Sequence, residues 1–172
     1  MREFVKPKII ISKCLGFASC RYNGQIIYDE FVTQLHKYID FSPVCPEAEL
    51  GLGVPRDPIR VVSQRGKISL VQPATGKDFT KEMNRFSESF LSGINEIDGF
   101  ILKAQSPSCG IKDVNIFLAI DTDDILEKGA GFFGQAVLMK FSYLPIEDEN
   151  TLTDPKIREH FLKTLHLHIR KK

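Results

Sequence analysis

The sequence has almost no net charge. Its 172 residues include 23 Lys and Arg and 22 Asp and Glu, so the formal charge is +1. It lacks the positive excess that strong nonspecific binding to phosphates requires. No apolar run approaches the roughly 20 residues needed to cross a bilayer. The composition therefore predicts no membrane partner and disfavours a large nucleic acid.

A secretion signal is also missing. In the segment 1–14 the only apolar run is Ile9–Ile11, and no small-residue cleavage pattern follows it. We therefore expect a cytoplasmic protein. Its length fits one domain of roughly 100–200 residues. A content of 42% hydrophobic and 26% charged residues is typical of an ordinary globular domain.

Cysteine is scarce and has no close pairing. The chain has four cysteines, Cys14, Cys20, Cys45 and Cys109, and none lies in a C-x-x-C motif. Because cytosolic thiols are kept reduced, a disulfide framework is not expected. Two interpretations stay open at this point: metal binding or catalysis, and simple burial as small apolar side chains.

Strand and helix patterns alternate along the chain. Short apolar runs predict strands, and apolar residues three or four apart predict helices. We expect strands at 8–14, 41–44, 59–63, 67–72, 100–103, 114–120 and 144–146, and helices at 29–39, 78–97, 132–141 and 155–169. The pair 59–63 and 67–72 predicts a hairpin, and Pro46 argues against a helix after Cys45. The pattern predicts a single α/β domain with a mainly parallel sheet flanked by helices.

Three cysteines follow predicted strands. Cys14, Cys45 and Cys109 each lie near a strand's carboxyl end, where parallel sheets form their ligand crevice. The three thiols could therefore converge into one site, and the alternative is that each is a small buried apolar side chain. Three thiolates can hold three irons of a [4Fe-4S] cluster and leave the fourth open. Zinc with three protein ligands and a water is the alternative, and the residue pattern does not separate the two metals.

Four segments follow, in order, the motifs of a known family: CLGFASCRYNG (14–24), VCPEAELGLGVPRDPIRVV (44–62), TGKDFT (75–80) and ILKAQSPSCG (101–110). They resemble the thiouracil desulfurase (TudS-like) iron–sulfur family, over about residues 8–147. We expect a desulfurase domain at 1–147 and a C-terminal helical tail at 148–172 packed on it. The tail is similar to a segment that leads into a separate C-terminal module in longer relatives. We expect a short form without that module.

The resemblance implies a [4Fe-4S] cluster on Cys14, Cys45 and Cys109, with the fourth iron free to capture sulfur. It implies hydrolytic, non-redox desulfuration of a thiolated pyrimidine such as thiouracil, with release of hydrogen sulfide. Glu47, two residues beyond a ligand, is then the candidate base. Ser108 would orient the substrate or relay a proton. The expected partner is a small thiolated base or nucleoside.

Four further residues are candidates for substrate binding. Arg21 and Arg56 could bind an anionic part of the substrate, or instead support loop backbone through hydrogen bonds. Lys103 could place a positive charge near the anionic cluster, and Ser106 lies in the same loop as Ser108. A function of another class also stays open: a non-catalytic cluster-binding or zinc-binding module that senses metal or redox state, or serves a partner protein.

Cys20 is extra relative to the shorter form of the family pattern. As a fourth ligand it would close the open iron and weaken the catalytic interpretation. We favour the other interpretation, a loop thiol that is not a ligand, because its loop permits but does not require an approach to the cluster.

Overall fold

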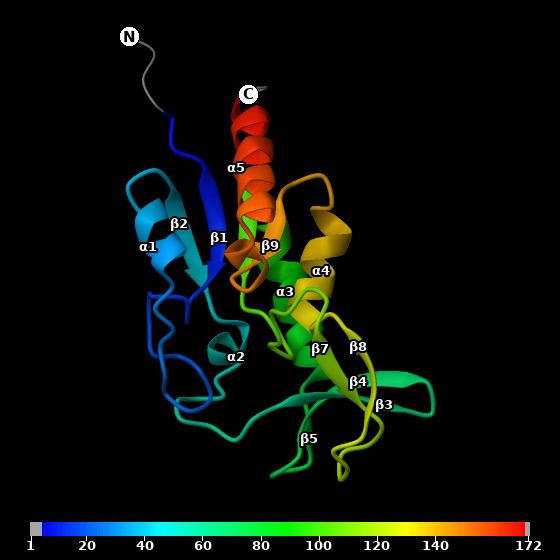
Figure 1. Cartoon of the computed structure of the whole chain (residues 1–172). Helices are drawn as coiled ribbons and strands as arrows, with labels where there is room; N and C mark the ends of the chain where they lie inside the picture. Colours follow the sequence, from blue (N-terminus) through cyan, green and yellow to red (C-terminus); the bar gives the residue numbers. More distant parts are fainter. Residues whose placement is uncertain (1–4, 171–172) are drawn as a thin grey trace.

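The structure is a computed structural model, which describes residues 5–170 (Figure 1). Its strands form two sheets. Sheet A has four parallel strands in the order β2 (Asp40–Val44), β1 (Lys8–Ser12), β6 (Gly99–Leu102) and β9 (Ile146–Asp148). Sheet B has five strands in the order β5 (Lys77–Asp78), β4 (Lys67–Gln72), β3 (Arg60–Gln64), β7 (Val114–Phe117) and β8 (Ile125–Gly129).

Helices cover both faces of sheet A. Successive residues of a strand point to opposite faces, and β1 buries both sets. Ile9 and Ile11 pack with α1 (Glu30–Leu35) and α5 (Pro155–Ile169). Ile10 packs on the other face with α3 (Thr80–Ser92) and α4 (Phe132–Lys140). The predicted α/β class, with a parallel sheet flanked by helices, is confirmed.

Local signals placed several elements correctly. The KIIIS run forms β1, and residues 59–72 contain the expected antiparallel hairpin. Asp154 caps α5 by accepting a hydrogen bond from the Lys156 N–H at 2.8 Å, and Pro155 is the first helical residue. α5 contributes Phe161 and Leu165 to the core beside sheet A.

Other parts of the fold differ from the expectations. A short helix, α2 (Pro46–Glu49), does begin directly after Cys45, because proline is well suited to the first helical position. α3 ends at Ser92, well before Gly99; Ile94 and Ile97 extend the apolar spacing but pack into the core from an irregular segment. Sheet B, apart from its hairpin, was not expected, and β3 and β7 form its one parallel pair.

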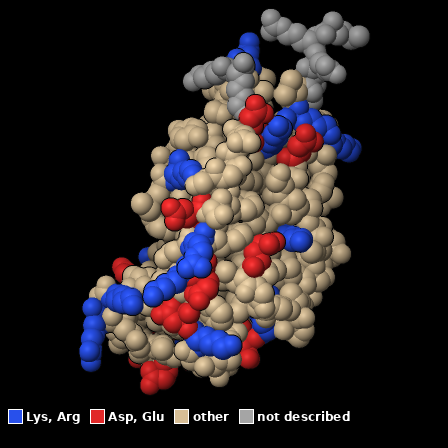
Figure 2. All heavy atoms as spheres, turned by 180° about the vertical axis from the view of Figure 1, so that it is seen from behind, with Lys and Arg blue, Asp and Glu red and all other residues tan. Residues whose placement is uncertain are grey.

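The charged side chains on one face of the molecule (Figure 2) reflect the balanced composition. On the face shown in Figure 2, basic and acidic side chains are interspersed, and neither sign forms a continuous field. Within residues 5–170, no helix is both long enough and apolar enough to cross a membrane.

Candidate active site

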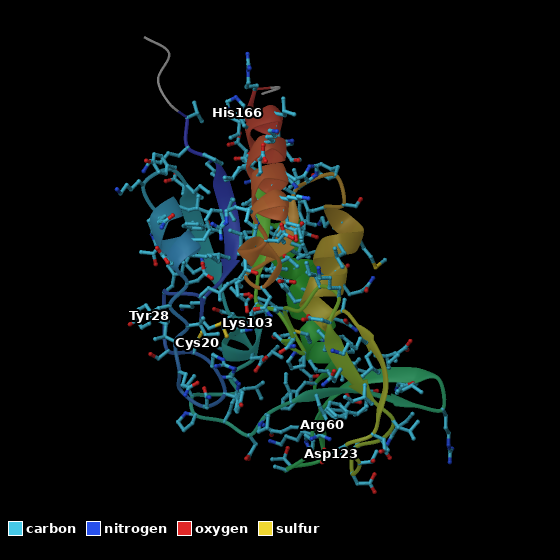
Figure 3. The ribbon with its side chains drawn as sticks, viewed as in Figure 1. Cys20, Tyr28, Arg60, Lys103, Asp123 and His166 are labelled. Carbon is cyan, nitrogen blue, oxygen red and sulfur yellow. The ribbon has the colours of Figure 1, made fainter. Side chains whose placement is uncertain are left out.

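A cavity of about 220 Å³ opens at the carboxyl ends of the sheet A strands. β1 lies between β2 and β6, and Ser12 pairs with Val44, so the segments that follow these strands begin at the same edge. In Figure 3, Cys20 and Lys103 mark this end of sheet A, and His166 marks the opposite end. The cavity wall includes all nine predicted site residues: Cys14, Arg21, Cys45, Glu47, Arg56, Lys103, Ser106, Ser108 and Cys109.

All four cysteines are free thiols in this cavity. Burial raises the pKa of Cys109 to about 12, against hydrogen bonds from Ser12 and Ser108 that lower it. A hydrogen bond with Cys20, together with burial, raises the pKa of Cys45. A hydrogen bond with Cys14 raises the pKa of Cys20 in the same way. The thiols of Cys20, Cys45 and Cys109 therefore stay protonated at neutral pH unless a bound metal stabilises their thiolates.

The chemistry of the donor set is that of an iron–sulfur cluster, because its ligands are thiols. Among the described residues, no group of three or more His, Cys, Asp or Glu is arranged to hold one metal ion. The zinc alternative therefore finds no support. A cluster places each cysteine on a different iron, so its ligands surround a group larger than one ion, and soft thiolates are the ligands that such clusters take.

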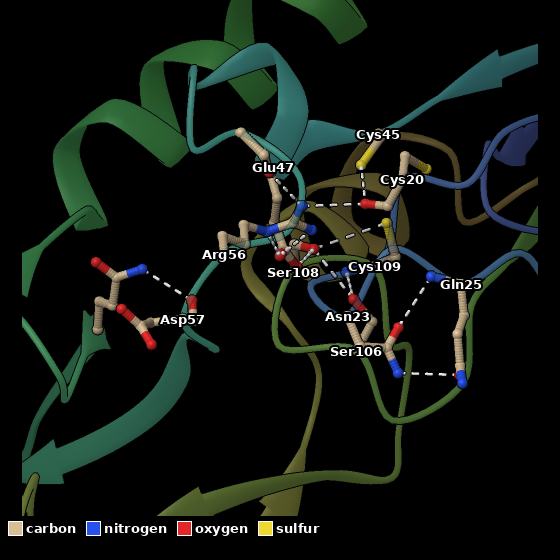
Figure 4. Close-up of polar contacts among 12 residues, drawn as sticks. Cys20, Asn23, Gln25, Cys45, Glu47, Arg56, Asp57, Ser106, Ser108 and Cys109 are labelled. Atoms are coloured by element: carbon tan, nitrogen blue, oxygen red, sulfur yellow. Dashed lines mark hydrogen bonds and ion pairs between the residues drawn. The ribbon is translucent and has the colours of Figure 1, made fainter.

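Glu47 lies at the centre of a polar network in the cavity (Figure 4). α2 begins right after Cys45, which puts Glu47 in its first turn and buries the carboxylate. The Ser108 hydroxyl donates to Oε1 at 2.8 Å, and Arg56 donates to Oε2 from Nε at 2.9 Å and from Nη2 at 2.7 Å. A carboxylate held in this way beside the thiols can accept a proton and, once protonated, can donate it again.

The loop that carries Ser108 and Cys109 is held by α4. Ser106 Oγ lies 3.0 Å from Ser108 Oγ and accepts the backbone N–H of Cys109 at 3.0 Å. Three N–H groups at the start of α4 donate to loop carbonyls: Gly131 to Gly110 at 2.8 Å, Phe132 to Pro107 at 3.2 Å and Gly134 to Ser108 at 2.9 Å. The glycines are needed because a Cβ on Gly134 would lie 2.2 Å from the Gly110 carbonyl oxygen.

Gly134→Ala is therefore expected to destabilise the fold by about 1–3 kcal/mol, as overpacking does, although alanine favours a helix. Thermal or urea unfolding measures this change. Gly93→Ala is the matched control, because there a Cβ would lie 3.5 Å or more from its neighbours, in ordinary contact. Equal stability of the two variants would show that the packing of α4 on the loop is not restrictive.

Lys103 and Arg21 differ in their surroundings. Lys103 forms an ion pair with Glu149, and its Nζ donates to the Ala104 carbonyl at 2.8 Å. Glu149 Oε2 in turn accepts the Ala104 N–H at 2.8 Å. Arg21 donates to the Gln25 side chain at 3.2 Å, and it has no carboxylate partner among the described residues. Lys103 is thus a paired cation, and Arg21 is the more available one.

Comparisons with known proteins agree with this geometry. A family model described as 2-thiouracil desulfurase matches residues 9–149. The chain belongs to the 2-thiouracil desulfurase family. An uncharacterized protein of Bacillus subtilis (strain 168), YbbK, is 33% identical over 109 residues, which are 59% of this chain and 72% of YbbK. The solved structure of the [4Fe-4S]-dependent thiouracil desulfidase TudS is 28% identical, with a TM-score of 0.68 over 92% of this chain and 99% of that chain.

In this member of the 2-thiouracil desulfurase family, two residues that contact the site were not predicted from the sequence. Ser12, the last residue of β1, accepts the Lys103 N–H at 2.8 Å and hydrogen-bonds the Cys109 thiol. A neutral serine in a buried strand gives no periodic or charge signal. Glu149 directly follows β9, and the rule that found the cysteines at strand ends could have found it, but the predicted strand stopped at Ile146.

Proposed function

We propose that this protein removes sulfur from a thiolated pyrimidine such as thiouracil, with a [4Fe-4S] cluster held by Cys14, Cys45 and Cys109. The observation that carries the proposal is the meeting of these thiols with the Glu47–Ser108 hydrogen bond in one cavity. The family membership and the likeness to a [4Fe-4S]-dependent thiouracil desulfidase support the same reaction.

The reaction is hydrolytic and transfers no electrons. When bound, a cluster with three protein ligands supplies an iron open to the substrate's sulfur, which polarises the carbon–sulfur bond. A carbon–oxygen bond forms with water and the carbon–sulfur bond breaks. The thiocarbonyl becomes a carbonyl, and sulfur leaves with both protons of the water as hydrogen sulfide. The residues of the chain therefore have to move protons and orient the two reactants.

Glu47 and Ser108 carry the proton transfers. Glu47 takes a proton from the attacking water, because its carboxylate is buried in the cavity wall two residues beyond Cys45. Ser108 donates to Glu47 Oε1 and also lies beside Cys109, so its hydroxyl orients the substrate or relays the proton. Ser106 extends this hydroxyl chain along the cavity wall.

The charges of the cavity suit a small substrate. Arg21, with no carboxylate partner in the described part of the chain, is available to a polar or anionic group of a thiolated base or nucleoside. Lys103 places a positive charge beside the thiolates and shares it with Glu149. A cavity of about 220 Å³ suits a small ligand.

The test is anaerobic reconstitution with iron and sulfide, followed by incubation with 2-thiouracil or 4-thiouracil. We expect uracil and sulfide to accumulate only with the loaded protein. A cluster that forms without turnover of any thioamide would overturn the proposal in favour of a non-catalytic module.

A further inference from the structure

Arg56 lies in the cavity wall, but its donors are directed at the protein. Its side chain is only 4% exposed. Besides the two bonds to Glu47, Nη1 donates to the Gly53 carbonyl at 2.9 Å and to the Cys20 carbonyl at 3.1 Å. A residue that recognises an anionic substrate needs accessible donors. Arg56 therefore has poor geometry for that role.

The bonds to Glu47 are asymmetric. Both Arg56 donors bind Oε2, and the Ser108 hydroxyl binds the other oxygen, Oε1. Charge-assisted bonds from a planar guanidinium fix one carboxylate oxygen and the plane of the group. The oxygen that faces Ser108 is thereby held in one direction.

Arg56 also joins two loops that carry the site. Its backbone N–H donates to the Tyr22 carbonyl at 2.8 Å, and its side chain binds the Cys20 carbonyl. The segment after Cys14 is thus tied both to the 51–58 loop and, through the same guanidinium, to Glu47 (Figure 4). This placement couples the direction of the carboxylate to the position of the cysteine loop.

We infer that Arg56 is a positioning residue for Glu47 and not an anion-binding residue of the site. The inference rests on the proposed function, in which Glu47 moves the proton. Arg56 then acts on the proton transfer by holding Glu47, and this effect is the same whether the substrate is charged or uncharged.

Turnover of uncharged thiouracil by the loaded Arg56→Gln variant distinguishes the two roles. We expect kcat to fall about a hundredfold, as small displacements of catalytic groups do, with little change in KM. Arg56→Lys keeps the charge but cannot reproduce these bonds, so it should not restore kcat. Arg21→Gln, at the available cation of the same cavity, should instead raise KM. Unchanged kcat in Arg56→Gln would overturn the inference and leave the proposed function standing.

A second measurement is independent of turnover. Urea unfolding of Arg56→Met, Glu47→Gln and the double variant gives the coupling between the two side chains. Because removal of one partner of a buried ion pair leaves the other unpaired, we expect Arg56→Met to raise the unfolding equilibrium constant on the order of a hundredfold. The double variant should recover a large part of this loss. Strictly additive effects would overturn the inference even if no thioamide is turned over.

Discussion

Glu47→Gln is expected to lower the turnover of thiouracil by about 10²–10⁴-fold, the usual contribution of a general acid–base group. The amide cannot take a proton from water, but it has the size of the carboxylate and an oxygen that can accept the bonds from Arg56. Cluster absorbance and iron content should therefore stay at the level of the unsubstituted protein. Steady-state kinetics on anaerobically loaded protein measures the effect.

Glu49→Gln is the matched control for this prediction. Glu49 lies on the same short helix, α2, but it is exposed and does not contribute to the cavity wall. Its substitution removes the same charge two residues away and should leave kcat close to that of the unsubstituted protein. Full turnover by Glu47→Gln with an intact cluster would remove Glu47 from the reaction.

Cys109→Ser is expected to lose most of the cluster iron, and with it all turnover. A serine hydroxyl is a hard, weakly acidic ligand in place of a soft thiolate. The same loss is expected for substitution of Cys14 or Cys45. Iron and sulfide analysis after reconstitution, together with the visible absorbance, measures the effect without any substrate.

Cys20→Ser is the control for this prediction. Cys20 is buried in the same cavity to a similar degree, 7% exposed against 4% for Cys109, and its thiol hydrogen-bonds Cys14 and Cys45. If three cysteines hold the cluster, Cys20→Ser keeps its iron. An equal loss of iron in Cys20→Ser would make Cys20 a fourth ligand and close the iron that the reaction requires.

The strand ends explain how far sequence reasoning could reach. The KIIIS run and the residues before Cys45 are short strands of a parallel sheet, so their ends had to meet near one edge. The family motifs then predicted which thiols hold the cluster and which carboxylate is the base. Pro46 misled because the same residue breaks a helix in its interior and begins one at its first turn.

Other features depend on contacts between distant segments. β8, the outer strand of sheet B, carries Ile125 and Leu126, each about half exposed. Its sequence therefore lacks the alternation of apolar and polar residues from which a strand is predicted. The sequence left Arg56 with two equal interpretations. Only the folded chain brings it to Glu47, nine residues away, and to the Cys20 carbonyl, thirty-six residues away. The contacts of Ser12 with Lys103 and Cys109 likewise join distant segments.

One measurement tests hydrolytic desulfuration most directly. Loaded protein is incubated anaerobically with thiouracil in water labelled with oxygen-18, without added reductant, and uracil and sulfide are quantified. We predict equal amounts of the two products, with the label in the new carbonyl of uracil. Uracil without the label, or sulfide release that requires a reductant, would contradict hydrolysis at this site.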